Sequence, residues 1–389
     1  MLVTHLSLTD FRNYETAEVD FAPGANLFVG SNGQGKTNLV ESLGYLSTLG
    51  SHRVATDHAM IRQGCDSAII RTRVQHGSRH VLAEVQLNRT SANRAQINRS
   101  AIRTRDLPRY FSSVLFAPED LALVRGEPSG RRRFLDELLV LLTPRLAGVM
   151  ADYERALKQR NSLLKSARAA GVKGAQLSTL EIWDDRLVAL GSELIEARSR
   201  LIAQLVPAVS AAYVAIAGED HRARLWSQLS ILSSNADAEE GTVQAPVGGE
   251  FVPISAADAA VAFRASLVRL RRAELERAVT LSGPHRDDLV LELNGMAARG
   301  YASHGESWSF ALALKLASAE VLRRESASGD PVLILDDVFA ELDQSRRARL
   351  AGAVAGFEQV LITAAVLEDV PAVLTANTVH IQQGRIVEK

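Results

Sequence analysis

The feature that most restricts how this chain can fold is a glycine-rich segment at residues 30–37. It reads Gly-Ser-Asn-Gly-Gln-Gly-Lys-Thr and fits the pattern G-x4-G-K-[ST]. Residues 26–29 before it form a short apolar run typical of a buried strand, and residues 39–49 after it have the period of a helix. A glycine-rich turn between a strand and a helix is the context that this motif requires. The sequence therefore predicts a P-loop in an α/β fold.

The residues of this loop have expected roles in holding a nucleotide. Backbone N–H groups curl around the phosphates, Lys36 reaches the β- and γ-oxygens, and the Thr37 hydroxyl holds Mg²⁺. We therefore predict ATP and Mg²⁺ as cofactors. The candidate nucleotide-binding residues of the loop are Gly30, Ser31, Asn32, Gly33, Gln34, Gly35, Lys36, Thr37 and Asn38.

A P-loop needs a second carboxylate for its metal ion, at the end of a buried strand. Residues 332–335 are four aliphatic side chains, and Asp336 and Asp337 follow them directly. We expect Asp336 to hold Mg²⁺ together with Thr37. Asp337 is placed to orient or deprotonate the attacking water. The predicted catalytic residues are thus Lys36, Asp336 and Asp337, brought together from positions roughly 300 residues apart.

A second candidate phosphate site lies about 30 residues before that strand. Ser303 and Glu306 form a capping box that opens a predicted helix over 306–324. A serine at a helix N-terminus, with Gly305 leaving the backbone open, can also bind an anion. ATP-binding-cassette proteins carry their S-G-G-Q signature at this position, where it contacts the γ-phosphate held by the other subunit. Asp343 stands at the D-loop position, so Ser303, Gly305 and Asp343 are further nucleotide-binding candidates.

The hydrophobic periodicity divides the rest of the chain into regions of strands and regions of helices. The first 30 residues alternate like strands, and residues 68–88 alternate on both sides of Gly77 as a hairpin does. Helical periods follow over 145–168, over 179–206 with an end before Pro207, and over 267–278. Between the last two, residues 233–258 hold five acids and no base, which predicts an exposed loop. The order is a β-rich start, a helical middle and an α/β end.

The charge is unevenly spread. The net charge is −1, yet residues 89–109 hold six Arg and one Asp, and residues 145–173 hold seven bases and two acids. Two local charges of +5 suit sequence-independent contact with DNA phosphates, so overall neutrality does not count against DNA. With one cysteine, Cys65, no secretory pattern and no apolar run of 18 residues, we expect a cytoplasmic protein without a membrane segment.

Beyond the nucleotide motifs, five segments make the chain resemble the RecF family of SMC-like cassette ATPases from end to end. They are Phe-Arg-Asn-Tyr at 11–14, Gly-Ser-His-Arg at 50–53, Phe-Ala-Pro-Glu-Asp-Leu at 116–121, Arg-Arg-Arg-Phe-Leu-Asp at 131–136 and Gly-Pro-His-Arg-Asp-Asp at 283–288.

The resemblance implies an α/β fold. An ABC-type P-loop ATPase head, with a mixed sheet and an antiparallel β subdomain, is expected at 1–118 plus 279–389. A mainly helical lobe is expected as an insertion at 119–278. The resemblance further implies an ATP-dependent homodimer on double-stranded and gapped DNA, slow DNA-stimulated ATP hydrolysis, and work with RecO and RecR to load RecA in repair and SOS induction.

The same resemblance makes Arg12, His52 and Arg53 candidates for nucleotide contact outside the P-loop. At several positions, however, this sequence differs from the usual motifs of the family and of cassette transporters. The signature usually reads S-x-G-Q-x-R, and here Glu306 replaces Gln and Trp308 occupies the Arg position. Asp337 stands where cassette transporters have Glu, Thr363 stands at their switch His, and the Q-loop region 116–120 has no Gln.

Three alternatives share part of this pattern. A transporter ATPase subunit predicts a Q-loop Gln, a switch His and no long insertion. Another SMC-like ATPase predicts longer helical arms than the roughly 40 Å helix at 179–206. A metabolic P-loop kinase leaves Ser303 and Asp343 without a role.

Overall fold

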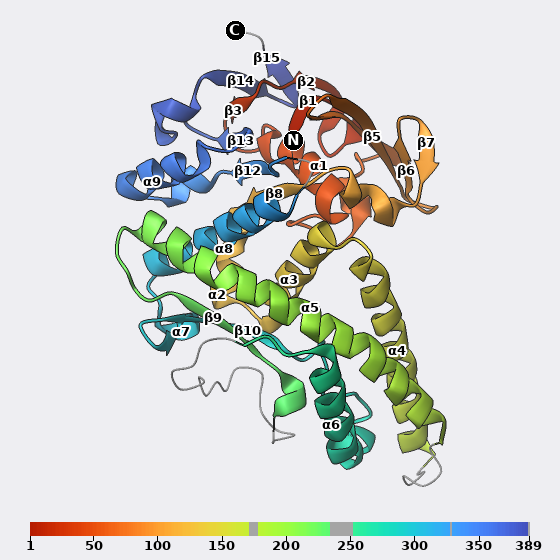
Figure 1. Cartoon of the computed structure of the whole chain (residues 1–389). Coiled ribbons are helices and arrows are strands. Elements are labelled where there is room, and N and C mark those ends of the chain that lie inside the picture. Colours follow the sequence, from red (N-terminus) through yellow and green to blue (C-terminus); the bar gives the residue numbers. More distant parts are fainter. Residues whose placement is uncertain (171–177, 234–251, 327–328, 388–389) are drawn as a thin grey trace. The chain divides into compact units, whose positions relative to one another are not determined.

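A computed structural model describes residues 1–170, 178–233, 252–326 and 329–387 (Figure 1). The chain forms two compact units. The first consists of residues 1–124, 208–221 and 302–389, and the second of residues 125–207 and 222–301. The predicted boundary at 279 is therefore too early, because residues 279–301 include a strand that pairs inside the second unit. Most of the predicted acidic loop, residues 234–251, lies outside the described residues.

The first unit contains an antiparallel sheet in the order β2-β1-β4-β5-β6-β7. The predicted hairpin about Gly77 is confirmed, since β4 and β5 pair from Ser67–Asn88 to His76–Arg79. The buried side chains of β4 and β5 alternate along each strand and enter the core of the unit. Its strands are β1 (Leu2–Phe11), β2 (Tyr14–Asp20), β4 (Ser67–His76), β5 (Arg79–Asn88), β6 (Arg94–Ile97) and β7 (Ser100–Ile102).

The same unit contains a mixed sheet in the order β15-β14-β3-β13-β12-β8, parallel except for β15. Helix α1 (Lys36–Thr48) contacts β8, β12 and β13 of this sheet. Mixed and antiparallel sheets around a P-loop confirm the predicted α/β fold class. The strands are β3 (Gly24–Val29), β8 (Ser113–Phe116), β12 (Val332–Asp336), β13 (Gln359–Ala364), β14 (Asn377–Gln382) and β15 (Arg385–Val387).

Two further helices of this unit bear on the site. Helix α8 (His304–Glu325) contacts β8 and is buried along most of its length, because its first half is almost free of charged side chains. Helix α9 (Gln344–Val354) follows β12 after a short 3₁₀ turn at Val338–Glu341. The predicted helix 306–324 and the predicted strand before Asp336 are thereby confirmed.

The second unit is mainly helical, with one small antiparallel sheet in the order β11-β10-β9. The helix predicted at 179–206 is longer than expected, because α5 runs through Pro207 to Ala217. Proline removes one backbone hydrogen bond, but buried residues on both sides of it, Leu205 and Val209, hold the helix together. The elements are α3 (Pro128–Leu142), α4 (Leu146–Ala169), α5 (Ser178–Ala217), β9 (Arg224–Gln228), α6 (Ala256–Arg277), β10 (Asp288–Leu293), β11 (Met296–Ala297) and α7 (Ala298–Tyr301), while α2 (Leu121–Arg125) precedes α3. The last part of α5, from residue 208 on, belongs to the first unit.

Ion pairs join the helices of the second unit. Arg160 of α4 is fully buried and donates to Asp184 of α5 at 2.7 Å and to Glu274 of α6 at 2.5 Å. Arg131 of α3 donates through two nitrogens to Asp288, the first residue of β10. Two of the sequence motifs, 131–136 and 283–288, therefore meet in one structural cluster. A buried charge of this kind persists only when it is fully paired.

Helix α5 also has a composition that bears on membranes. Within Thr179–Ala217 an 18-residue window reaches a mean hydropathy of 1.6, and this is the one helix in the described residues long and apolar enough to cross a membrane. By length and composition alone, the core helix of a soluble protein passes the same test. Of that window 33% is buried, and Leu187, Ile195 and other apolar side chains of α5 pack in the hydrophobic core of the second unit.

Asp287 is an ionisable group buried in this unit. Its Oδ1 accepts hydrogen bonds from the Ser230 N–H and hydroxyl, both at 2.8 Å, while Oδ2 is buried with no partner among the described residues. Burial raises the pKa of Asp287 to about 6 although Ser230, Arg198 and Arg132 all lower it. The charged form is therefore a source of instability at neutral pH.

An Asp287→Asn substitution should change how stability depends on pH. The unfolded chain ionises Asp287 near pH 3.8 and the folded chain near pH 6, so its stabilising contribution is present below pH 3.8 and is lost as pH rises to about 6. The variant should gain about 1–3 kcal/mol relative to the parent chain over that window. Urea unfolding at pH 4, 5, 6 and 7 measures this gain, and parallel profiles would contradict it.

Candidate nucleotide-binding site

The P-loop follows β3 and ends at Gly35, the residue before α1. Gly35 has φ 112°, a conformation that favours glycine. A Cβ at this position would lie 2.7 Å from Asn13 Nδ2 and 2.9 Å from Tyr14 Oη, so a larger residue would also clash. Both observations explain why the predicted loop needs glycine at its end.

Two turns of the first unit hold the loop in place. The Gln34 carbonyl accepts a hydrogen bond from the Gly384 N–H at 2.9 Å and one from the Asn13 side chain at 3.3 Å. The Tyr14 hydroxyl donates to the Gly35 carbonyl at 3.0 Å. Asn13 and Tyr14 belong to the Phe-Arg-Asn-Tyr segment, so the structure assigns this motif a supporting role at the P-loop. Ser31, Asn32 and Gly33 remain exposed at the tip of the loop.

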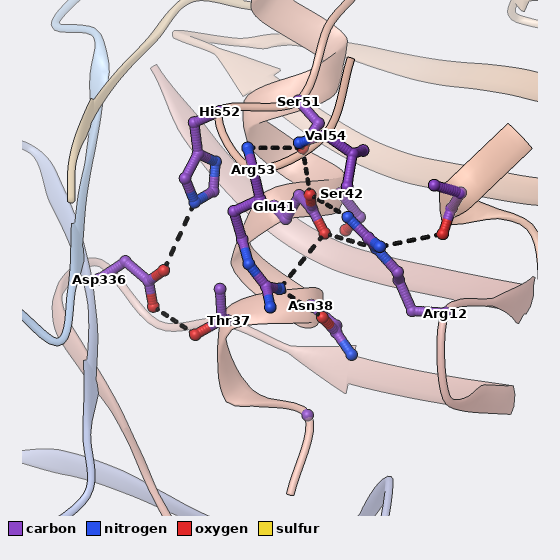
Figure 2. Close-up of polar contacts among 12 residues, drawn as sticks. Arg12, Thr37, Asn38, Glu41, Ser42, Ser51, His52, Arg53, Val54 and Asp336 are labelled. Atoms are coloured by element: carbon purple, nitrogen blue, oxygen red, sulfur yellow. Dashed lines mark hydrogen bonds and ion pairs between the residues drawn. The ribbon is translucent and has the colours of Figure 1, made fainter. Parts of the chain in front are cut away.

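The two halves of the predicted metal site meet. Thr37 Oγ1, in the first turn of α1, donates to Asp336 Oδ1 at the end of β12 at 2.9 Å, although the residues are 299 positions apart (Figure 2). Lys36 is 3% exposed, and its Nζ donates to the Ser31 carbonyl at 3.3 Å. The ammonium group is thus turned back into the loop, where the resemblance expects the phosphates.

Asp336 is held by two more groups. The Thr363 hydroxyl donates to Asp336 Oδ1 at 2.6 Å, and His52 Nε2 lies 3.7 Å from Asp336 Oδ2. The buried His52 Nε2 has no hydrogen-bond partner in the described part of the chain. Figure 2 shows the imidazole ring pointing at the carboxylate. Thr363, which stands at the transporters' switch-His position, is therefore a support of the metal carboxylate.

Asp337 differs from its neighbour in having an unused oxygen. Its N–H donates to the Thr363 hydroxyl at 2.9 Å, while its Oδ1 is buried and unpartnered among the described residues. The backbone is left-handed, with φ 51° and ψ 20°. Burial raises the pKa of Asp337 and the charge of Asp336 raises it further, against a lowering by Lys36. A carboxylate with a raised pKa and a free oxygen is suited to accepting a proton.

The sequence reasoning missed Glu41, a fully buried carboxylate one turn after Thr37 on α1. It accepts two hydrogen bonds from the Arg12 guanidinium, at 2.9 and 2.6 Å, and one from the Ser51 hydroxyl. Arg12 is therefore placed on Glu41, and its expected contact with nucleotide remains a prediction. The available signal was an acidic residue in an otherwise apolar stretch of helix.

Arg53 lies beside the P-loop helix. Its Nη1 donates to Asn38 Oδ1 at 2.9 Å, and Asn38 in turn donates to Asn13. Arg53, Asn38 and Arg12 line a polar hollow of about 540 Å³, together with Asn13, His58, Ala59, Ile61, Gln63 and Arg89. The structure thus gathers both predicted arginines on one side of the loop.

The residues present fit a magnesium ion. Mg²⁺ prefers oxygen ligands and is usually held by one or two protein groups plus substrate phosphates. Thr37 and Asp336 offer two oxygens in contact with each other. In the described residues no cluster of three or more His, Cys, Asp or Glu side chains forms a metal cage, so a shared protein–phosphate site is the arrangement that the chain supports.

The predicted capping box at the start of α8 is confirmed. Glu306 N–H donates to the Ser303 hydroxyl at 3.3 Å, and the Ser303 N–H donates to Glu306 Oε2 at 2.7 Å. Hydrogen bonding with Ser303 lowers the pKa of Glu306, and His221 and Arg346 lower it further. Trp308 is buried and its Nε1 donates to His304 at 3.1 Å. Glu306 is therefore ionised at neutral pH and caps its own helix, as expected.

Two other predicted segments also have structural partners. Asp343 is the N-cap of α9, where its side chain accepts from the Arg346 N–H at 2.9 Å. In the 116–120 segment, Asp120 accepts from the Ala117 N–H at 2.8 Å and pairs with Lys315 at 2.9 Å. Among the described residues, the hydrogen bonds of Ser303 and Asp343 stay near α8 and α9 and do not reach the P-loop.

Comparison with known proteins identifies the family. Residues 2–385 match the model described as RecF/RecN/SMC N terminal domain. The chain is 66% identical over 388 residues to the DNA replication and repair protein RecF of Leifsonia xyli subsp. xyli, covering 100% of both chains. It belongs to the RecF family. A RecF relative from Clavibacter sepedonicus is 65% identical over 390 residues, which cover 100% of this chain and 95% of that protein.

Solved structures agree with this assignment. A structure titled as the recombination mediator protein RecF with ATP in the RecFOR pathway matches with a TM-score of 0.86 at 26% identity, covering 100% of this chain and 97% of that one. An SMC head domain bound to the winged helix domain of ScpA matches at a TM-score of 0.53 and 15% identity, which shows the shared fold alone. RecF membership decides against a transporter subunit and a metabolic kinase.

Proposed function

We propose that this chain is an ATP-gated DNA-binding recombination mediator. ATP and Mg²⁺ bind at the P-loop, binding drives two heads to associate on DNA, and slow hydrolysis releases them. The observation that carries this proposal is the 2.9 Å contact between Thr37 and Asp336. It joins a P-loop to a strand-end carboxylate in the arrangement that ATP hydrolysis requires.

The roles of the residues follow from their geometry. Lys36 binds the β- and γ-phosphate oxygens from its buried position, and the loop backbone with Gly30, Ser31, Asn32 and Gly33 surrounds the phosphates. Thr37 and Asp336 hold the metal ion, which when bound neutralises charge on the phosphates. Asp337 accepts the proton of the attacking water through its free oxygen. The polar hollow beside Arg12 and Arg53 takes the sugar or base of the nucleotide.

The second half of the site comes from another copy. The described hydrogen bonds at the N-termini of α8 and α9, where Ser303, Gly305 and Asp343 lie, stay within those helix ends. We therefore expect these three residues to contact ATP that is bound by the partner subunit. Two heads related by a two-fold axis would each complete the other's site. ATP-dependent homodimerisation is therefore part of the proposal.

DNA contact is proposed for two basic surfaces. Arginines with exposed side chains gather around β6, β7 and the turn after them, and they are Arg94, Arg99, Arg103, Arg105 and Arg109. On α4, Lys158, Lys165 and Arg168 are exposed. Arg160 is fully buried and does not contribute, and Lys173 lies outside the described residues. Contacts of this kind bind phosphates regardless of base sequence.

The wider role follows from the family. The solved relatives are named as recombination mediators of the RecFOR pathway. We extend this to the present chain as a protein that works in the cytoplasm with RecO and RecR to load RecA at gapped DNA, in repair of stalled forks and in SOS induction. Its ATPase is proposed to be weak and DNA-stimulated.

Sizing the protein with and without DNA tests the proposal. With ATP–Mg²⁺ the mass of the particle in light scattering should double, and a gapped duplex should join the dimer. Binding should weaken steeply between 50 and 200 mM salt, by about 10³-fold or more if six phosphates are contacted. A monomer with ATP, or DNA binding that salt leaves unchanged, would refute the proposal.

A Glu306→Gln substitution should strengthen ATP-dependent association. The amide restores the residue usual in the family, can still cap α8, and removes a negative charge from a surface that faces phosphate. At a separation near 8 Å and an effective dielectric constant near 40, this is worth about 1 kcal/mol, or roughly fivefold in the dimer dissociation constant.

Sedimentation equilibrium in ATP–Mg²⁺ measures this change. Glu219→Gln is the matched control, because Glu219 also lies beside His221, at 3.2 Å, but is exposed. It should leave the dissociation constant within twofold. Equal effects of the two substitutions would show that Glu306 does not face the phosphate.

A further inference from the structure

Arg346 connects the D-loop position to the signature helix. It is the third residue of α9, and its Nη1 donates to Asp343 Oδ2 at 2.6 Å. Its Nε donates to the Ser309 hydroxyl, in the second turn of α8, at 3.2 Å. The side chain is 27% exposed. One guanidinium therefore spans two segments that are separated in sequence and are both expected at the dimer face.

The guanidinium also lies on Gly305. A Cβ on Gly305 would stand 2.9 Å from Arg346 Nη2, 3.0 Å from Nη1 and 3.2 Å from Cζ. Gly305 is absent from the residues with positive φ, so its backbone conformation does not require glycine, and the close approach comes from the end of the Arg346 side chain alone. The space beside Gly305 is thus filled by the Arg346 guanidinium. The sequence had instead suggested that the backbone at Gly305 is open to an anion.

This cation changes the charge of the surface. The Arg346 N–H holds the pKa of Asp343 below its usual range and the guanidinium lowers it further, while the same charge contributes to the lowered pKa of Glu306. Both carboxylates are therefore ionised at neutral pH. Without Arg346 this face would present two anions to a phosphate, beside the partial positive charges of the N-termini of α8 and α9.

One nitrogen of the Arg346 guanidinium, Nη2, can still donate a hydrogen bond to a ligand. Nη1 and Nε have the partners named above, and Nη2 donates no hydrogen bond to any residue in the described ranges. The arginine that the family signature usually carries is replaced by Trp308, which is buried and bonded to His304. Arg346 is the guanidinium that the described structure places against this signature turn.

We propose that Arg346 contacts the γ-phosphate of the ATP bound by a second copy of this chain. This inference rests on the proposed ATP-dependent dimer and adds to it the residue that makes the signature face cationic. Asp343 and Ser309 hold Nη1 and Nε of the guanidinium, so that Nη2 is the nitrogen that donates to a phosphate oxygen.

A purely structural role is the competing explanation. A partly exposed i,i+3 ion pair contributes little to stability, so loss of Arg346 should hardly change folding. A contact with the partner's phosphate should instead change association, and only with ATP. The two explanations therefore differ in what they predict for the monomer and for the dimer.

The first experiment compares Arg346→Ala with Arg349→Ala, which removes another arginine of α9. Arg346→Ala should raise the dimer dissociation constant in ATP–Mg²⁺ by about 30-fold or more, the usual result of removing one partner of a desolvated charge pair. Binding of a fluorescent ATP analogue to the dilute monomer should stay within twofold, and the melting temperature within a few degrees. Arg349→Ala should associate as the parent chain does.

The second experiment shows which subunit needs the arginine. Mass-tagged Arg346→Ala is mixed with Lys36→Ala, so that ATP on the first variant faces an intact Arg346 on the second. The mixture should form heterodimer although neither variant associates alone, and the tagged parent chain, which also joins Lys36→Ala, is the control that one bound ATP is enough. A mixture of the two variants without heterodimer, where the parent chain does join Lys36→Ala, would place the effect of Arg346 inside its own subunit and overturn the proposal.

The possible outcomes distinguish a failure of the proposed function from a failure of the role assigned to Arg346. If the parent chain stays monomeric in ATP–Mg²⁺, the proposed function fails. If the parent chain associates and Arg346→Ala associates equally well, the function stands and the assignment of Arg346 is overturned. An equal loss in Arg346→Ala and Arg349→Ala would also overturn it, because the effect would then be one of helix α9 in general.

Discussion

Lys36→Ala should bind ATP about 10- to 100-fold more weakly and lose ATP-dependent association. The buried ammonium group, 3% exposed, is the one P-loop side chain that carries positive charge to the phosphates. A hydrogen bond to a charged group is worth about 1.5–3 kcal/mol, which sets the loss in affinity. Association falls with it, because in a dimer of Lys36→Ala neither subunit holds the nucleotide that its partner contacts. Titration with a fluorescent ATP analogue and light scattering measure the two effects.

Lys158→Ala is the matched control, since it removes an exposed lysine from α4 in the second unit. It should bind ATP and associate normally, although its DNA binding becomes weaker. The melting temperature of nucleotide-free Lys36→Ala should stay close to that of the parent chain, because the Lys36 ammonium makes a single, long hydrogen bond of 3.3 Å within the described ranges. Association of Lys36→Ala at the parent ATP concentration would refute the assigned role of the P-loop.

Asp337→Asn should hold ATP and keep the dimer closed while hydrolysis slows by about 10²- to 10⁴-fold, the usual contribution of a general base. The amide matches the carboxylate in size, and asparagine tolerates the left-handed backbone at this position, with φ 51°. The buried Oδ1 has no partner in the described structure that the substitution would break. Single-turnover hydrolysis of radiolabelled ATP measures the rate, and sedimentation follows the lifetime of the dimer.

Asp336→Asn distinguishes the role of Asp336 from that of Asp337. Asp336 accepts from Thr37 and Thr363, and its role is to hold the metal ion, so its amide should weaken Mg²⁺-dependent ATP binding itself. Asp337→Asn should leave that binding within twofold. Normal turnover by Asp337→Asn would mean that another group accepts the proton.

Local patterns predicted the elements that surround the nucleotide. The P-loop, the strand before Asp336 and the capping box at Ser303 each depend on residues within a few positions of one another, so they can be read from one stretch of sequence. The long helix at 178–217 shows the limit of this reasoning. Pro207 predicts an end because of its missing N–H, whereas α5 continues through it on the strength of apolar burial on both sides.

The domain boundary shows the same limit. The family resemblance led us to expect residues 279–301 in the head. In the structure β10 pairs with β9 of the second unit, from Asp288–Gln228 to Glu292–Arg224. Strand partners are chosen by distant segments, and the alternation of one strand does not name its neighbour.

The roles of charged side chains depended most on the three-dimensional arrangement. Sequence alone predicted the P-loop, its metal carboxylate and the two-sided nucleotide chemistry, because these need particular residue types at short, fixed spacings. It did not show that Arg12 is bound to the buried Glu41, or that the guanidinium of Arg346 fills the space over Gly305. An arginine reaches any carboxylate that packing brings within a few ångströms, and packing joins residues that lie far apart in the chain. Only the folded structure selects which of those pairs exist.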